Sequence, residues 1–249
     1  IYAYINGIQQ TDNIDISSVT GSVSNASNLK IGYGTGWKTQ GYLDEFKIYP
    51  YARSAAEIKV DANQGAAKIG AGDSVTASNG LIGYWKMDEV SGTTVADASG
   101  NANTSTLTNA QEAGTSDASG NSTTTMIDTD GTFSATDDVY NGMILNFTAT
   151  CGSIASGTQR AISDYVGSSK TFTVSPALAA APDSCAYSIL HQAGGKFGNG
   201  IRLDGDNDYI KPTTYASFTT DITYNVWINR ANVSTANQSL INMRGTMLE

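Results

Sequence analysis

The sequence predicts an all-β protein, and two observations support this fold class. Apolar and polar residues alternate in short runs such as residues 81–88, and a period of two places successive side chains on opposite faces of a strand. Gly, Ser, Asn and Asp gather between these runs, as turns require, and 26 glycines stand against 4 prolines. No apolar run approaches the roughly 20 residues needed to cross a bilayer, so we expect no membrane span in this piece.

The net charge of the chain indicates which kinds of binding partner are unfavourable. Lys and Arg number 14 and Asp and Glu 23, which gives a formal net charge of −9. Nucleic acids bind basic surfaces, so we expect no nucleic-acid partner. The abundance of small polar residues is typical of extracellular or cell-surface β proteins. The chain begins with Ile1, and we expect a piece cut from a longer polypeptide.

The first segment, residues 1–58, reads as strands followed by a short helix. Tyr2, Tyr4 and Ile8 alternate with other residues around the dipeptide Asn6-Gly7, which is a strong hairpin signal. The run GYLDEFKIY at 41–49 is a long strand, and Ser54 and Glu57 have the spacing of a helix capping box. Residues 59–80 continue this helix and then become a linker rich in Gly, Ala, Ser and Asp.

Three further motifs follow in order: the GYW–DE strand with its D-SGN loop at 81–101, the GKFG hairpin at 194–211, and the TYNVWINR strand at 223–230. Together with GYLDEFKIY they resemble the laminin-G-like and concanavalin-A-like lectin/glucanase domains of secreted and surface proteins. The resemblance implies a jelly-roll sandwich. It also implies that residues 1–58 end one domain and that residues 81–109 with 193–249 begin the next.

Such a division leaves both lectin-like pieces incomplete. Half of a sandwich exposes strand edges and an apolar face, so we expect chain outside this piece or neighbouring copies to complete it. A tandem array or polymer is the favoured explanation. A circular permutation is the alternative.

Residues 110–192 interrupt the second lectin-like piece with a strand pattern of their own. Residues 124–190 resemble the small β modules of phage fibres and bacterial appendages. This implies a compact, β-barrel-like domain inserted in a surface loop, where insertions are tolerated. Both cysteines, Cys151 and Cys185, lie in this insert, and we predict one disulfide between them. Two separate buried thiols are the alternative.

The lectin-like resemblance also implies a calcium ion near the D-SGN loop and the closing strand. The matching residues are Asp97, Asn101 and Asp44, which carry the oxygen ligands that calcium prefers. In the two-domain interpretation Asp44 and Asp97 belong to different copies. The run Asp204-x-Asp206-x-Asp208 is interpreted as a hairpin turn rather than as a metal loop.

We expect no catalytic residues. The chain has a single histidine, His191, which we expect at the surface. The adjacent pairs Asp44-Glu45 and Asp88-Glu89 point to opposite faces of their strands, so neither provides the paired carboxylates of a glycosidase.

The three tryptophans are the candidate sugar contacts. Trp85 and Trp227 match core positions of the lectin-like pattern, whereas Trp37 lies in a Gly-rich loop and is the predicted ligand contact. The sequence therefore predicts a non-enzymatic extracellular module for adhesion that binds glycan. The alternative is a structural repeat of an extracellular filament, sheath or fibre that binds neighbouring copies of itself.

Overall fold

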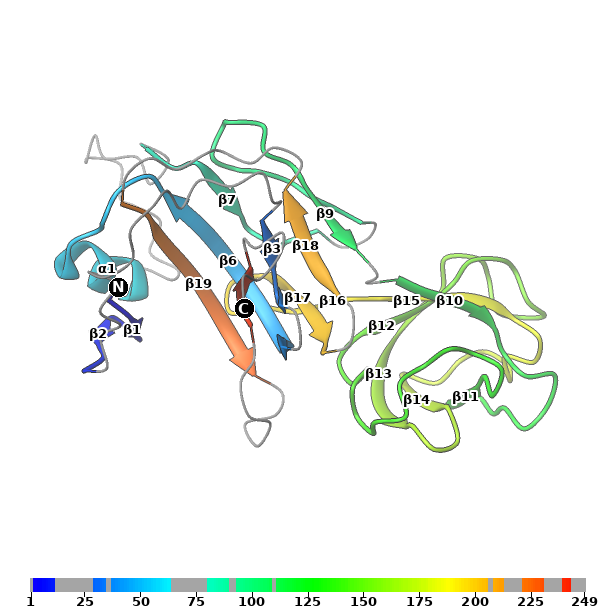
Figure 1. Ribbon diagram of the computed structural model, residues 1–249. Helices are drawn as coiled ribbons and strands as arrows, with labels where there is room; N and C mark the ends of the chain where they lie inside the picture. The colour runs from blue at the N-terminus through cyan, green and yellow to red at the C-terminus, as the bar shows by residue number, and fades with distance from the viewer. Residues whose placement is uncertain are drawn as a thin grey trace.

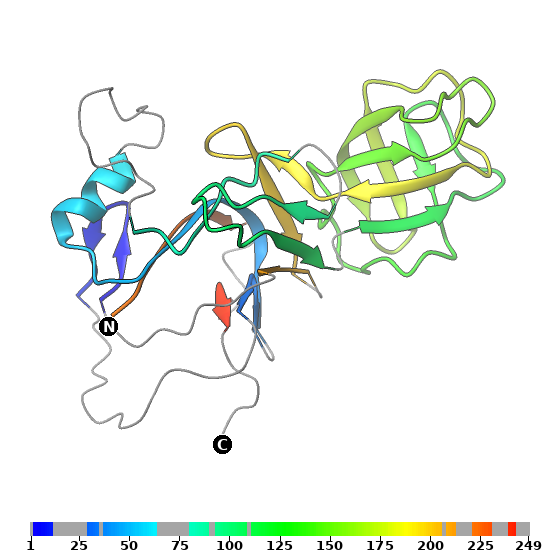
Figure 2. The same cartoon turned by 90° about the horizontal axis from the view of Figure 1, so that it is seen from above.

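The computed structural model is all-β, which confirms the predicted fold class, and it consists of two units side by side (Figure 1). It describes residues 2–11, 29–34, 37–63, 80–89, 93–108, 111–205, 208–212, 221–230 and 239–242. One unit is a two-layer β-sandwich, and the other is the insert. Figure 2 shows the insert at one end of the sandwich, reached and left through neighbouring strands.

The sandwich packs two antiparallel five-stranded sheets around one core. The first sheet contains β16 (Gln192–Gly194), β17 (Asn199–Asp204), β6 (Gln40–Tyr49), β19 (Thr223–Arg230) and β7 (Gly83–Trp85). The second contains β20 (Ile241–Asn242), β3 (Lys30–Ile31), β18 (Tyr209–Pro212), β9 (Ser105–Thr108) and β8 (Thr94–Val95). Alternate side chains of both sheets fill the core, among them Ile31, Leu43, Phe46, Trp85, Leu107, Ile201 and Ile210.

Strand β6 is the central element of the first sheet. It pairs with β19 along one edge and with β17 and β7 along the other. The sequence predicts that residues 1–58 and residues 81–109 with 193–249 belong to successive domains, but here their strands share one sheet. The physical reason is that the free edges of β6 find hydrogen-bond partners within the same chain.

The insert folds around its own core. Its six antiparallel strands follow the order β10 (Gln111–Thr115), β15 (Ala186–Leu190), β12 (Ile144–Phe147), β13 (Gln159–Val166), β14 (Thr171–Ser175) and β11 (Thr125–Ile127). The sheet curls around an aromatic cluster in which Tyr140 and Tyr165 meet edge to face at 4.7 Å between ring centroids. Cys151 and Cys185 form a disulfide across this unit, which confirms the predicted pairing.

The N-terminal hairpin follows the sequence signal closely. Strands β1 (Tyr4–Ile5) and β2 (Ile8–Gln9) pair antiparallel around Asn6-Gly7. Both turn residues have positive φ, 51° for Asn6 and 75° for Gly7, as a type I′ turn requires. A second short pair joins β4 (Tyr33–Gly34) to β5 (Trp37–Lys38).

Helix α1 (Ala55–Asn63) begins at the predicted capping box. The Ser54 backbone N–H donates to the Glu57 carboxylate at 2.8 Å, and the Glu57 N–H donates back to the Ser54 hydroxyl at 3.3 Å. Within the described ranges, no helix has the length and apolar character needed to cross a membrane.

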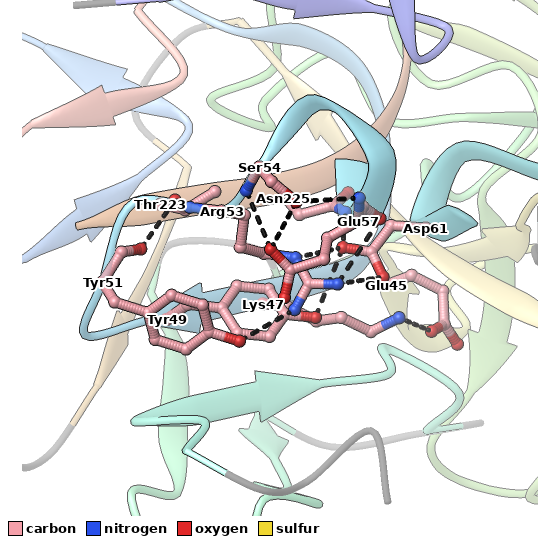
Figure 3. Close-up of polar contacts among 10 residues, drawn as sticks. All are labelled: Glu45, Lys47, Tyr49, Tyr51, Arg53, Ser54, Glu57, Asp61, Thr223 and Asn225. Carbon is pink, nitrogen blue, oxygen red and sulfur yellow. Dashed lines mark hydrogen bonds and ion pairs between the residues drawn. The ribbon is translucent and has the colours of Figure 1, made fainter. Parts of the chain in front are cut away.

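An ion pair holds α1 against the sheet (Figure 3). The Arg53 guanidinium lies 3.0 Å from the Asp61 carboxylate and stacks 4.1 Å from the centroid of the Tyr49 ring. On β19, the Asn225 amide donates to Asp61 at 3.0 Å. The Tyr49 hydroxyl of β6 donates to Asp61 at 3.5 Å, so the same carboxylate ties the helix to both β6 and β19.

Candidate functional site: a cleft between the sandwich and the insert

The outer face of the first sheet carries a cleft that the insert helps to enclose. Its volume is about 410 Å³, within the range of small-molecule sites. The lining comes from β6, β19, the hairpin between β16 and β17, and one residue of the insert. These residues are Tyr42, Asp44, Gly142, Gly194, Gly195, Lys196, Trp227, Ile228 and Asn229.

The floor of the cleft is an array of cross-strand pairs. Trp227 lies directly opposite Asp44, and Asn229 lies opposite Tyr42. Directly opposed residues of an antiparallel pair point to the same side of the sheet. One aromatic ring, one carboxylate, one amide and one phenol therefore face the same space.

A β-bulge in β6 creates this arrangement. The register with β19 shifts between Asn225 and Trp227, so β6 carries an extra residue at this point. Glu45 adopts φ of 54°, a left-handed conformation uncommon for a residue with a side chain. The bulge lets Leu43 and Phe46, three residues apart, both reach the core, while Asp44 lines the cleft.

Asp44 is the most unusual group of the cleft. Its side chain is buried, with 2% exposed, and Oδ2 accepts a hydrogen bond from the Phe197 N–H at 2.8 Å. Oδ1 is buried and accepts no hydrogen bond of ordinary distance and angle, and the backbone N–H groups of Phe197, Lys196 and Glu45 only partly offset the burial of this carboxylate. Burial raises the pKa of Asp44 to about 6. A buried carboxylate oxygen without a partner is costly, so a ligand hydroxyl or amide that donated to it would gain a strong hydrogen bond.

Trp227 supplies an apolar wall. Its ring is partly exposed, and the edge of Phe197 supports it at 5.5 Å between centroids and an interplanar angle of 79°. The Lys196 ammonium lies 5.2 Å from the centroid of the Trp227 ring. Because the Lys196 side chain is exposed and long, it can move aside for a ligand or contact it.

The insert closes the far side of the cleft. The Tyr42 hydroxyl donates to the Asn141 carbonyl at 3.2 Å and accepts from the Arg202 guanidinium at 2.8 Å. Gly142 has φ of 84°, and a Cβ at this position would lie 2.4 Å from the Tyr42 hydroxyl oxygen. A glycine is therefore required where the insert meets the sandwich.

The D-SGN loop is built around Asp97. Its Oδ1 accepts from the backbone N–H groups of Tyr84 at 2.9 Å and Ser99 at 2.8 Å. Its Oδ2 accepts from the Ser99 hydroxyl at 2.8 Å and the Asn103 N–H at 2.9 Å. Burial opposes the charge of Asp97, but these hydrogen bonds outweigh burial and hold its pKa below the ordinary value.

These contacts bear on the predicted calcium ligands. The Asn101 amide donates to the Leu81 carbonyl at 2.6 Å, and both oxygens of Asp97 already accept two hydrogen bonds each. The residues described in the structure contain no cluster of three or more side chains suited to a metal. A calcium ion at Asp97 would have to replace hydrogen bonds that hold the loop, whereas Asp44 keeps one oxygen free. Calcium binding stays a prediction.

The tryptophans separate into different roles. Trp85 is 1% exposed and its indole N–H donates to the Asn103 carbonyl at 2.9 Å, which confirms the predicted core position. The prediction of a core position for Trp227 is wrong, because β19 turns this ring toward the cleft. Trp37 begins β5, and its side chain lies outside the described part of the structure.

The expectation of a surface position for His191 is also wrong. His191 is fully buried, where the strand leaving the insert enters the sandwich. Its partners, Glu112 and Asp208, are far from it in sequence, and no spacing pointed to them.

The chain matches no family model, no curated protein and no solved structure. The resemblance to laminin-G-like and concanavalin-A-like domains therefore stays a prediction from the motifs. The candidate site rests on its geometry.

Proposed function

We propose that this protein is a non-enzymatic extracellular module that binds glycan in the cleft between the sandwich and the insert and thereby serves adhesion. The observation that carries this proposal is the pairing of Trp227 with Asp44 across β19 and β6. An apolar ring lies beside a buried carboxylate oxygen that lacks a partner.

This chemistry suits a sugar. A pyranose ring has an apolar C–H face and a rim of hydroxyl groups. The flat ring of Trp227 can stack on the C–H face. The Asp44 carboxylate can accept hydrogen bonds from the hydroxyls, and the Asn229 amide can both donate and accept them. A cleft of about 410 Å³ is large enough for a short oligosaccharide segment.

Binding without hydrolysis is part of the proposal. Glycosidases of the two-carboxylate type place a second Asp or Glu about 5 to 10 Å from the first, on the sugar. Asp44 is the single carboxylate among the described residues that line this cleft. The neighbouring Glu45 accepts a hydrogen bond from the Tyr84 hydroxyl instead.

The disulfide supports the extracellular part of the proposal. Disulfides persist in oxidising compartments, and Cys151 and Cys185 are joined here. The acidic, weakly charged composition is compatible with the same location. Tandem domains of the laminin-G-like class, which the motifs resemble, would present such a cleft repeatedly along a surface protein.

A glycan array probed with the whole chain tests the proposal, followed by calorimetric titration of the selected glycan. We expect Trp227→Ala to lower affinity by at least about tenfold, since it removes the stacking surface, and Trp227→Phe to keep most of it. Equal affinities of the wild type and Trp227→Ala would contradict the proposed site. An array without any retained glycan would contradict the function.

One observation favours the structural alternative. Tyr2, Ile5 and Ile8 of the N-terminal hairpin are 68%, 61% and 68% exposed. An exposed apolar group of this kind is typical of a contact surface, and a neighbouring copy of the chain is the proposed occupant in a filament or fibre. Sedimentation of the wild type against a triple Ser variant at these residues tests it. A concentration-independent monomer for both proteins would contradict it.

A further inference from the structure

A buried charged cluster lies where the insert joins the sandwich. His191 is fully buried, Asp208 is 2% exposed and Arg202 is 5% exposed. Glu112 of β10, half-buried, completes the cluster from the insert. We propose that His191 is a permanently charged imidazolium that locks the insert to the sandwich and fixes the insert as one wall of the cleft.

His191 lies inside a strand that serves both units. It follows β15, which pairs with β10 and β12 in the insert, and precedes β16, which pairs with β17 in the sandwich. The Arg202 backbone N–H donates to the His191 carbonyl at 2.8 Å, so the ladder continues through the histidine. Figure 1 shows this strand passing from one unit into the other. A side-chain contact of His191 can therefore set the angle between the two units.

The partners of the ring define its protonation. Nδ1 lies 2.9 Å from the Arg202 carbonyl oxygen and 3.1 Å from Oδ2 of Asp208. Nε2 lies 3.1 Å from Oε2 of Glu112. A carbonyl can only accept, and Oδ2 of Asp208 also accepts the Asp204 N–H at 2.8 Å. Nδ1 therefore carries a proton, and in the proposed lock Nε2 carries a second proton that it donates to an ionised Glu112, which makes the ring positively charged.

Two carboxylates face the charged ring, Glu112 from the insert and Asp208 from the sandwich. A third carboxylate, Asp204, is also buried nearby, and its backbone N–H donates to Asp208. Burial lowers the pKa of His191, but the hydrogen bonds that the ring donates to Asp208 and Glu112 outweigh burial and raise the pKa above the ordinary value. Removing one member of a buried pair leaves the other uncompensated, which is strongly destabilising. The interface between the units therefore depends on the charged ring.

Arg202 provides the second tie. Its Nε donates to the Val139 carbonyl and its Nη2 to the Asp138 carbonyl, both at 2.9 Å. The same loop of the insert continues to Gly142, which lines the cleft. The lock thus holds the cleft wall in place. This consequence for ligand binding rests on the proposed function, whereas the lock itself does not.

NMR of the imidazole tests the charge directly, because His191 is the only histidine of the chain and its signals are unambiguous. We expect both ring nitrogens to be protonated, with shifts that stay constant between about pH 5 and pH 8. An unperturbed histidine would titrate near 6.5. Titration of the folded protein with such a midpoint, or a neutral ring at pH 7, would overturn the proposal.

Residual dipolar couplings of the whole chain test the lock without any ligand. In the wild type we expect one alignment tensor for the insert and the sandwich, and in His191→Gln two. Arg160→Gln is the matched control, because Arg160 contacts the Ala177 carbonyl within the insert. Two tensors in the wild type, or one shared tensor in His191→Gln, would overturn the proposal.

Glu112→Gln is the second variant, to be measured if His191→Gln does not fold. It removes the carboxylate partner that the insert provides to His191. We expect the ring of His191 to titrate at lower pH in this variant and the tensors to separate. An unchanged ring and a shared tensor would overturn the proposal. Loss of glycan affinity together with these changes would link the lock to the cleft, and failure of the glycan array alone would leave the lock intact.

Discussion

Removal of the disulfide has a predictable cost. Cys151 and Cys185 are 34 residues apart in sequence, and closing a loop of this length restricts the unfolded chain by about 4 kcal/mol in the chain-entropy estimate. The variant Cys151→Ala/Cys185→Ala should lose this amount of unfolding free energy. Cys185 is fully buried in the insert core, so its truncation also removes packing contacts and lowers the unfolding free energy slightly further.

The tryptophans make the assay specific. Trp37, Trp85 and Trp227 all lie outside residues 110–192, so tryptophan fluorescence reports the sandwich, while tyrosine fluorescence and near-ultraviolet circular dichroism report the insert as well. In urea, we expect the insert of the double Ala variant to unfold at lower concentration, with an unfolding free energy lower by about 4 kcal/mol, and the tryptophan transition to move less. Reduction of the wild type should reproduce the shift. A change below about 1 kcal/mol would refute the loop-closure reasoning.

The remaining predictions concern Asp44, Ser54 and Gly142. Burial raises the pKa of Asp44 from 3.8 to about 6, so the folded protein holds this proton more tightly than the unfolded chain. The unfolding free energy should therefore fall as pH rises from about 4 to 6, and Asp44→Asn should remove this dependence in urea titrations at each pH. Ser54→Ala should lower the unfolding free energy by about 1 kcal/mol through loss of the helix cap, and no change in thermal melting would contradict the capping geometry. Gly142→Ala should displace the insert and weaken glycan binding, because its Cβ would lie 2.4 Å from the Tyr42 hydroxyl oxygen. Gly157→Ala, with φ of 80° and open space around it, carries the same backbone strain and should keep affinity.

Local signals predicted the local structure. The Asn6-Gly7 turn, the Ser54 capping box and the alternation through Trp85 each depend on a few neighbouring residues, and all three are present in the structure. The disulfide was predictable because the chain has two cysteines and both lie in one insert. The insert was expected as a separate unit because residues 110–192 have a strand pattern of their own, and its compactness was implied by the resemblance to small β modules of fibres and appendages.

The cleft could not be predicted in the same way. Its residues meet only because β6 pairs with β19, more than 170 positions further along the chain, and because a bulge shifts the register beside Asp44. Pairing of distant strands is not encoded in any short pattern. The strand pattern of β19 shows alternation, but it does not show that the Trp227 side faces a cleft rather than the core.

His191 illustrates the same limit. A single histidine in a polar sequence is typical of a surface position, and its burial depends on Glu112 of β10 and on Asp208, which directly precedes β18. The carboxylates that make burial of a charged histidine possible reach it only when the insert packs against the sandwich. The order of residues along the chain does not reveal this packing.

A crystal structure with a glycan selected on the array tests the proposed glycan site most directly. We expect a sugar ring stacked on Trp227, with one hydroxyl about 2.7 Å from Oδ1 of Asp44. The insert should keep its contact at Gly142 in that complex. A sugar bound elsewhere on the protein, with no ligand in the cleft and no new contact at Asp44, would contradict the proposed glycan site.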